Sequence, residues 1–217
     1  MMSNPWENVS LNDYENHMKL PIINQIQTLN SIMKCQINKY DDISTIAILG
    51  ISGGNGLEYI NPIKIKTVYG IDINQNYLDV CRQRYDYLSS CLILENLDIS
   101  NENINIPKVD LVIANLFIEY IGVKKFIKQI EKTTPRYVSC VIQKNLDVDF
   151  VSDSPYTAAF NDISKIHNDI AQNDLIIEMN EIGYSTINST EIYLPNKKMF
   201  IWTDFFIRHC NIYLNCI

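Results

Sequence analysis

The feature that most constrains the fold is a regular alternation of short, strand-like apolar runs with stretches of helical periodicity. Five such runs lie at 45–49, 67–72, 91–97, 109–115 and 137–142. Parallel strands need a crossover connection of a dozen or more residues, and that connection is usually a helix. The alternation therefore predicts an α/β protein with a largely parallel sheet.

The chain closes with a different pattern. Two further strand-like segments, 186–194 and 199–207, are joined by Pro195-Asn196-Lys197-Lys198. Because this turn is too short to hold a crossover helix, the two strands are expected to pair antiparallel. Five parallel-type strands followed by an antiparallel hairpin form a specific combination.

Apolar residues at helical spacing predict four main helices, with stripes over 22–33, 78–88, 126–130 and 166–177. The first is expected to open near Pro21, the second is capped by Asn74, and the last ends at Gly183. A short helix before them is capped by Ser10 or Asn12. The irregular stretch 145–162 is long for a compact domain, and such loops are usually functional or mobile.

Composition narrows the classes of function. The chain carries 18 Lys+Arg against 25 Asp+Glu, a formal charge of −7, which disfavours a nucleic-acid partner. No apolar run approaches the roughly 20 residues that span a bilayer, and the first residues lack a signal-peptide pattern. We therefore expect a soluble, cytoplasmic protein with no membrane partner. The six cysteines show no Cys-x-x-Cys spacing and the three histidines no paired ligand motif, so we expect reduced thiols and no metal site.

A glycine cluster follows the first strand. Four of the seven glycines lie within Gly50-Ile51-Ser52-Gly53-Gly54-Asn55-Gly56. Glycine lets the backbone turn sharply and approach a ligand, and a following helix would offer unpaired N–H groups. A dinucleotide fingerprint needs Gly-x-Gly-x-x-Gly, but Ser52 and Asn55 stand where its second and third glycines belong. A glycine turn that serves packing alone is the other interpretation.

A second alignment of this loop fits the rest of the chain. Gly54-Asn55-Gly56 matches the end of an acidic-x-Gly-x-Gly-x-Gly loop, Asp72 ends the second strand, and the hairpin closes the chain. In these features the sequence resembles the class I S-adenosylmethionine-dependent methyltransferases over nearly its whole length. It is most similar to small bacterial members with Gly-Asn-Gly-Leu-Glu at 54–58 and Asp-Tyr-Glu-x-His-Met at 13–18, with Trp6 upstream.

The resemblance implies a Rossmann-like, doubly wound, seven-stranded sheet that is mostly parallel, has a C-terminal antiparallel hairpin strand and carries helices on both faces. It implies one methyltransferase domain over 1–217, with 1–40 as a helical cap over the cofactor and substrate cleft. The loop 145–162 would be a lid.

The resemblance also implies roles for single residues toward S-adenosylmethionine, whose product is S-adenosylhomocysteine. Asp72 would accept both ribose hydroxyls, Asp98 would meet the adenine amino group, and Tyr14 would close over the methionine end. Two departures stand out, since the acid that usually opens the loop is Gly50 and its first glycine is Ser52. The full expected cofactor set is Tyr14, Gly50, Ile51, Ser52, Gly54, Asp72, Ile73, Asp98, Ile99, Asn115 and Leu116.

The implied reaction is in-line methyl transfer to an oxygen or nitrogen of a small-molecule acceptor. Such a reaction depends mainly on alignment in a dry pocket, with a base where the acceptor arrives protonated. Catalytic candidates are Asn115, Glu119 and Tyr120, with His17 and His167 as further base candidates. Substrate candidates are His17, Tyr156 and Phe160.

Several alternatives stay open. Glu119 is equally interpreted as a solvated first-turn glutamate, and the two histidines as packing residues. The protein is alternatively a non-catalytic member of the fold that binds cofactor or a partner, and an NAD(P)-binding oxidoreductase is less favoured. A homodimer is left open as well.

Overall fold

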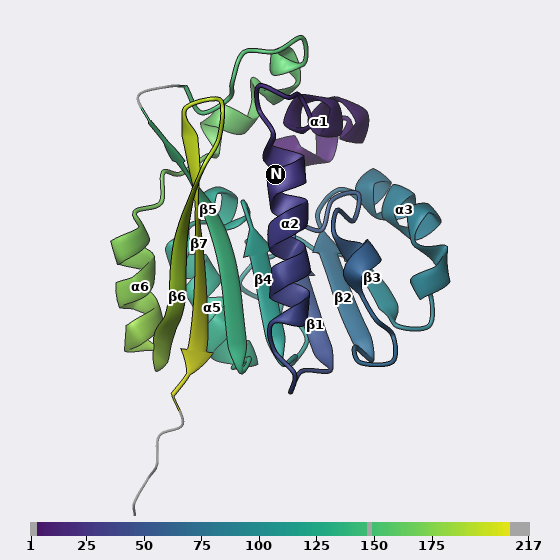
Figure 1. Cartoon of the computed structure of the whole chain (residues 1–217), viewed down its shortest axis with the longest axis vertical. Coiled ribbons are helices and arrows are strands. Elements are labelled where there is room, and N and C mark those ends of the chain that lie inside the picture. The colour runs from purple at the N-terminus through teal and green to yellow at the C-terminus, as the bar shows by residue number, and fades with distance from the viewer. Residues whose placement is uncertain (1–3, 147–148, 209–217) are drawn as a thin grey trace, which may run out of the picture.

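Seven strands form one sheet in the order β3-β2-β1-β4-β5-β7-β6 (Figure 1). In this computed structural model, which describes residues 4–146 and 149–208, β1 to β5 run parallel and β7 runs antiparallel to both of its neighbours. The predicted Rossmann-like sheet with its antiparallel hairpin is confirmed. The strands are β1 Thr45–Leu49, β2 Thr67–Asp72, β3 Leu92–Asn96, β4 Leu111–Asn115, β5 Tyr137–Asn145, β6 Tyr184–Tyr193 and β7 Lys198–Ile207.

Helices cover both faces of the sheet, as predicted. Helices α2 (Gln25–Asn38) and α3 (Gln75–Arg84) bury Met33, Ile37, Leu78 and Cys81 against one face. Helices α5 (Val123–Thr133) and α6 (Gln172–Glu181) bury Phe126, Ile130, Leu175 and Met179 against the other. Figure 1 shows α2 crossing the sheet and α1 (Leu11–Met18) beyond the strand ends. In the described part of the chain, no helix is both long and apolar enough to cross a membrane.

Two helices depart from the predicted stripes. Helix α2 begins at Gln25 rather than near Pro21, because Asn24 takes a left-handed conformation (φ 55°), and Ile22 is left 64% exposed. Helix α6 begins at Gln172, so Ile166 and Ile170 precede it, while Ile177 is 54% exposed. The helical spacing of these isoleucines was therefore coincidental, and Leu175 and Met179 form the buried side of α6.

The helix expected after the glycine cluster is absent. One 3-10 turn, η2 (Leu57–Tyr59), follows Gly56, whose φ is 94°. A Cβ at Gly56 would lie 2.5 Å from the Cβ of Met33 on α2, so α2 occupies the layer where such a helix would pack. The backbone of the loop itself, rather than a helix N-terminus, therefore faces any ligand.

The segment 1–40 divides into two parts. The 3-10 turn η1 (Pro5–Asn8) and α1 lie at the carboxyl edge of the sheet and are called the cap below, whereas α2 packs on the face of the sheet. Ser10 caps α1, since its hydroxyl accepts the Asp13 N–H. Asn74 caps α3 as predicted, and its amide also donates to the Trp6 carbonyl at 2.8 Å, which fastens the cap to the sheet edge.

The long loop after β5 contains two short 3-10 turns. After β5, the chain forms the 3-10 turns η4 (Thr157–Phe160) and η5 (Ile163–Lys165), and Phe160 is buried beside Val9 of the cap. Cys81, Cys91 and Cys140 are free and buried, and Cys35 is free and exposed. Cys210, Cys216 and His209 lie outside the described residues.

Candidate functional site

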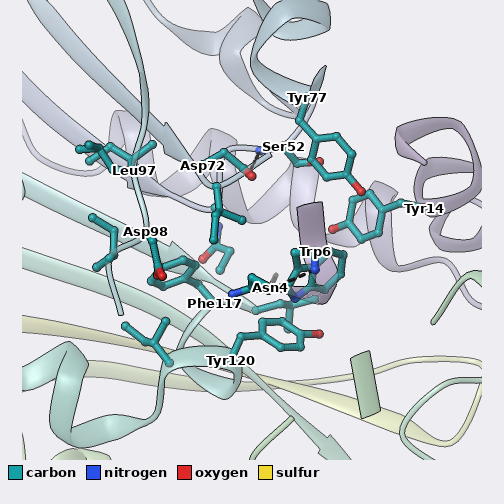
Figure 2. A pocket seen from close by; sticks show the side chains of 17 residues that line it. Asn4, Trp6, Tyr14, Ser52, Asp72, Tyr77, Leu97, Asp98, Phe117 and Tyr120 are labelled. Atoms are coloured by element: carbon teal, nitrogen blue, oxygen red, sulfur yellow. Dashed lines mark hydrogen bonds between the residues drawn. The ribbon is translucent and has the colours of Figure 1, made fainter. Parts of the chain in front are cut away.

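A cleft opens at the carboxyl ends of β1 and β4, where the strand order of the sheet reverses (Figure 2). Ligands of open α/β sheets bind at this switch point. About 690 Å³ of space, open solvent at the mouth included, lies within the cleft. Its walls come from the glycine loop, the end of β2, residues 97–99, residues 115–121 and the cap.

Asp72 provides the fixed acceptor of the cleft. Its side chain ends β2 and is 8% exposed. One carboxylate oxygen accepts the Ser52 N–H at 2.9 Å, and the other accepts the Asn74 N–H at 2.9 Å. Burial raises the pKa of Asp72, and these backbone N–H groups oppose that rise. Because a carboxylate has about four lone-pair positions, two acceptor positions are left for hydroxyls of a ligand.

The glycine loop presents its backbone to this cleft. Gly50 has φ +69°, and a Cβ there would lie 2.9 Å from Cδ2 of Phe117, so a side chain would intrude on the cleft wall. Ser52 also takes a left-handed conformation, with φ 53°. Its hydroxyl is buried and has no hydrogen-bond partner among the described residues. A buried orphan hydroxyl of this kind is satisfied by a ligand or water.

Two other predicted loop residues support the cleft from behind. Ile51 is 5% exposed, and its side chain fills the space that a Cβ at Gly70 would need. Gly54 faces the ring of Tyr85 and the sulfur of Cys81. Neither lines the cleft, so the expected cofactor set is divided between contacting and supporting positions.

The cleft wall opposite the cap consists of apolar side chains around one carboxylate, that of Asp98. Asp98 and its neighbours Leu97 and Ile99 line the cleft together with Ile73 and Phe117. One carboxylate oxygen of Asp98 accepts the Ser100 N–H at 2.9 Å, which fixes the turn after β3. Figure 2 shows Leu97 and Asp98 across the cleft from Tyr14 and Tyr77. The arrangement offers apolar surface for a flat ring with an acceptor at its rim.

The roof is a cluster of aromatic rings. Tyr14 stacks on Tyr77 with ring centroids 6.3 Å apart, and Trp6 meets Tyr14 edge-on at 5.7 Å. Trp6 also meets Tyr120 edge-on at 5.0 Å. Burial raises the pKa of Tyr14, and the charge of Asp72 adds to the rise, so its hydroxyl stays a neutral donor. The predicted position of Tyr14 over the cleft agrees with this cluster.

Asn115 is held rather than free. Its amide and that of Gln36 exchange two hydrogen bonds, at 2.9 and 2.8 Å, and Gln36 also donates to Ser139 at 2.8 Å. Leu116 follows with φ 52° and lines the same cleft. Asn115 is therefore a wall residue with a fixed orientation.

A second cavity adjoins the first. The two share Trp6, Tyr14, Leu116 and Tyr120, which form a partition between them. The predicted substrate residues His17 and Phe160 line the second cavity. Its remaining lining residues are Met18, Gln25, Gln143, Phe150, Val151 and Lys198.

His17 is a neutral base in this cavity. Its Nδ1 lies 2.8 Å from the Ser154 hydroxyl, and its ring packs on Phe160 at 4.8 Å. Burial lowers the pKa of His17 to about 4, and the charge of Lys198 adds to this effect. The imidazole is therefore uncharged at neutral pH, with one ring nitrogen as donor and the other as acceptor.

Lys198 is the residue that the sequence analysis missed. It is 2% exposed at the start of β7, and its ammonium donates to the Phe150 carbonyl. Burial lowers its pKa to about 8. A lysine in a hairpin turn is ordinarily solvated, so no sequence pattern indicates its burial.

Three candidates lie outside both cavities. Glu119 is 2% exposed; one oxygen accepts the Gln143 N–H at 2.8 Å, the other has no partner among the described residues, and burial raises its pKa to about 7. The surface interpretation of Glu119 is thus wrong.

Tyr156 packs near Phe160 without lining the cavity. His167 stacks on Phe150 at 3.7 Å. Within 4–146 and 149–208, no three metal-ligating side chains form a group.

Comparison with solved structures identifies the fold. The N-methyltransferase NodS from Bradyrhizobium japonicum, solved with S-adenosylhomocysteine, matches with a TM-score of 0.67 at 12% identity over 94% of this chain and 96% of that chain. The chain has the class I methyltransferase fold. Magnesium protoporphyrin IX methyltransferase from Synechocystis, solved with bound S-adenosylmethionine, shares the methyltransferase fold with a TM-score of 0.60 at 10% identity, over 94% and 88% of the two chains.

The same fold also occurs in a protein described by another reaction. The cyclase SpnF matches with a TM-score of 0.62 at 8% identity, over 83% of this chain and 80% of that one. No protein-family model matches the sequence, and no curated protein is significantly similar to it. The methyltransferase fold is therefore established by structure alone, and the reaction has to be inferred from the site.

Proposed function

We propose that the protein is an S-adenosylmethionine-dependent methyltransferase that acts on a small molecule. The observation that carries this proposal is the geometry at the end of β2. There, the buried Asp72 keeps acceptor positions free in the cleft, beside the unpartnered hydroxyl of Ser52 and the exposed backbone at Gly50. Solved proteins of the same fold hold S-adenosylmethionine or its product.

The residues present fit the cofactor. Asp72 would accept the ribose hydroxyls, and Leu97, Ile99 and Phe117 would sandwich the adenine, with Asp98 at its amino group. The methionine end would lie along Gly50 and Ser52 under the Tyr14 ring.

Gly50 leaves that end without the usual acid. Glu15 lines the region beside the loop, but its carboxylate is paired with Arg84. The ammonium of the cofactor would therefore rely on carbonyl and hydroxyl groups, which hold a cation less strongly than a carboxylate does.

The cofactor would supply an activated methyl group, which leaves with its bonding electrons remaining on the sulfur while a lone pair of the acceptor forms the new bond. The chain's own contribution is alignment and exclusion of water. Trp6, Tyr14 and Tyr120 separate the two cavities and so set the line along which an acceptor meets the cleft. His17, neutral and facing the second cavity, would orient an acceptor by a hydrogen bond, because its lowered pKa makes it a weak base.

Binding of S-adenosylhomocysteine tests the proposal. Calorimetry is expected to give micromolar affinity for the unmodified protein and at least tenfold weaker binding for Asp72→Asn. That loss corresponds to one charge-assisted hydrogen bond of about 1.5–3 kcal/mol. Asp79→Asn, on the exposed side of α3, is the matched control and keeps the affinity. Absence of binding to the unmodified protein would refute the proposal.

A non-catalytic cofactor-binding protein is the second candidate. The feature that favours it is Gly50, which stands where related loops carry an acid, and the cyclase SpnF shows that the fold serves other purposes. A screen with radiolabelled S-adenosylmethionine and small acceptors separates the two. Label transfer supports the enzyme, whereas tight binding with no transfer to any acceptor supports the second candidate.

A further inference from the structure

The second cavity contains a buried cation that has no carboxylate partner among the described residues. Lys198 is 2% exposed, and within the described residues no carboxylate oxygen lies within ion-pair distance of its ammonium. Asp149 acts on it electrostatically from farther away. Its ammonium donates to the Phe150 carbonyl, which leaves two of its three N–H donors. Buried charges in proteins are normally paired, because the desolvation of a lone ion is costly.

The lining of the second cavity supplies no negative charge to this ammonium. No Asp or Glu among the described residues lines the cavity, and its other polar groups are the amides of Gln25 and Gln143, the neutral imidazole of His17, the hydroxyls of Tyr14 and Tyr120 and the indole N–H of Trp6. Lys198 is thus its one charged lining residue among those described. The chain has a net charge of −7, so a positively charged cavity is a local exception, and it favours an anionic ligand.

The rest of the cavity wall is aromatic. Rings of Trp6, Tyr120, Phe150 and Phe160 line it, and Trp6 and Tyr120 belong to the partition with the cofactor cleft. Lys198 lies over the Phe150 ring, with its ammonium 5.8 Å from the centroid. Aromatic walls of this kind pack a flat, apolar body by offset or edge contacts.

We propose that the second cavity binds a flat, apolar carboxylic acid whose carboxylate pairs with Lys198 while its body lies among the aromatic rings. That this acid is the methyl acceptor rests on the proposed function, in which a carboxylate oxygen would form the new O–CH3 bond as the methyl–sulfur bond breaks and leaves its electron pair on sulfur; the binding of the acid does not rest on that function. A purely structural lysine, retained for its bond to the Phe150 carbonyl, is the competing explanation. The proposal requires the affinity for a ligand to depend on the charge of its end group, whereas a purely structural lysine does not.

Three matched ligands measure that difference. Cinnamate, cinnamamide and cinnamylamine share one flat skeleton and carry a negative, a neutral and a positive end group. Titration calorimetry of each is performed on the unmodified protein, Lys198→Met and Lys198→Arg. We expect cinnamate to bind the unmodified protein best, to lose at least tenfold in affinity with Lys198→Met, and to recover to within threefold with Lys198→Arg.

The neutral ligand separates recognition from folding. Cinnamamide is expected to bind all three proteins equally, because its contacts are with the rings. Equal losses of cinnamate and cinnamamide in Lys198→Met, or cinnamate binding no more tightly than cinnamamide to the unmodified protein, would overturn the proposal. Stronger binding of cinnamylamine would overturn it as well. Thermal unfolding of each variant checks that it is folded.

The same proteins separate this inference from the proposed function. S-adenosylhomocysteine is titrated into each variant alone, and Lys198→Met is expected to keep its affinity because Lys198 does not line the cofactor cleft. If S-adenosylhomocysteine fails to bind, the proposed function fails, and the cinnamate series without it still decides whether Lys198 recognises a carboxylate.

Discussion

Glu119 allows a quantitative test of the structure through the pH dependence of stability. Its carboxyl is 2% exposed, and burial raises its pKa from 4.5 to about 7. In Glu119→Gln the amide oxygen still accepts the Gln143 N–H, and no charge is left to bury. The change therefore removes the titration and largely keeps the shape.

The sign follows from the protons that each state binds. Between pH 4.5 and about 7, the folded state holds a proton on Glu119 that the unfolded state has lost, so the unmodified protein loses stability as the pH rises through this range. Above pH 7 both states are ionised and the loss is constant. At 1.36 kcal/mol for each tenfold change in acidity, the loss is about 3 kcal/mol.

Urea unfolding at pH 4.5, 6, 7 and 8 measures the effect. The free energy of unfolding of Glu119→Gln minus that of the unmodified protein is expected to rise by about 3 kcal/mol over this range, whatever its value at pH 4.5. Glu131→Gln, at an exposed position of α5, is the control, and its difference is expected to stay within about 0.5 kcal/mol. A flat difference for Glu119→Gln would show that this carboxyl is not buried as described.

Three further substitutions probe the loop and the cap. Gly50→Ala, at φ +69° with its Cβ 2.9 Å from Phe117, is expected to lower the free energy of unfolding by about 1–2 kcal/mol and to weaken S-adenosylhomocysteine binding, as measured by urea unfolding and calorimetry. Asn74→Ala removes a helix cap and the bond to the cap segment, which costs about 1–2 kcal/mol in the same unfolding assay. Arg84→Gln breaks the partly exposed pair with Glu15, so the free energy of unfolding changes by less than about 1 kcal/mol while limited proteolysis within residues 5–18 becomes faster; unchanged proteolysis would contradict a fastening role.

The predictable part of the fold is the part determined by local pattern. The five apolar runs and the short hairpin turn specify the strands and their direction, and glycine after β1 together with Asp72 at the end of β2 indicates the edge where the cleft lies. Both features depend on neighbours in sequence. Helix α6 ends before Gly183 as predicted, but its predicted start and buried stripe were wrong, because a helical stripe indicates an apolar face only where the chain is helical and Ile166 lies before that helix begins.

The second cavity depends on contacts between distant segments. His17 meets Ser154, Gln25 meets Gln143, and Lys198 reaches the carbonyl of Phe150. No local pattern brings these residues together, so the sequence suggested His17 and Phe160 singly and left Lys198 unnoticed.

The partition shared by the two cavities is expected to couple the affinities of their ligands. Because the rings of Trp6, Tyr14 and Tyr120 face both cavities, a ligand that orders them on one side also fixes the shape of the other. Such energetic coupling is reciprocal, so each ligand changes the affinity of the second by the same factor. Binding in either cavity is therefore expected to change the affinity of the other cavity for its own ligand by one common factor, in whichever order the two ligands bind.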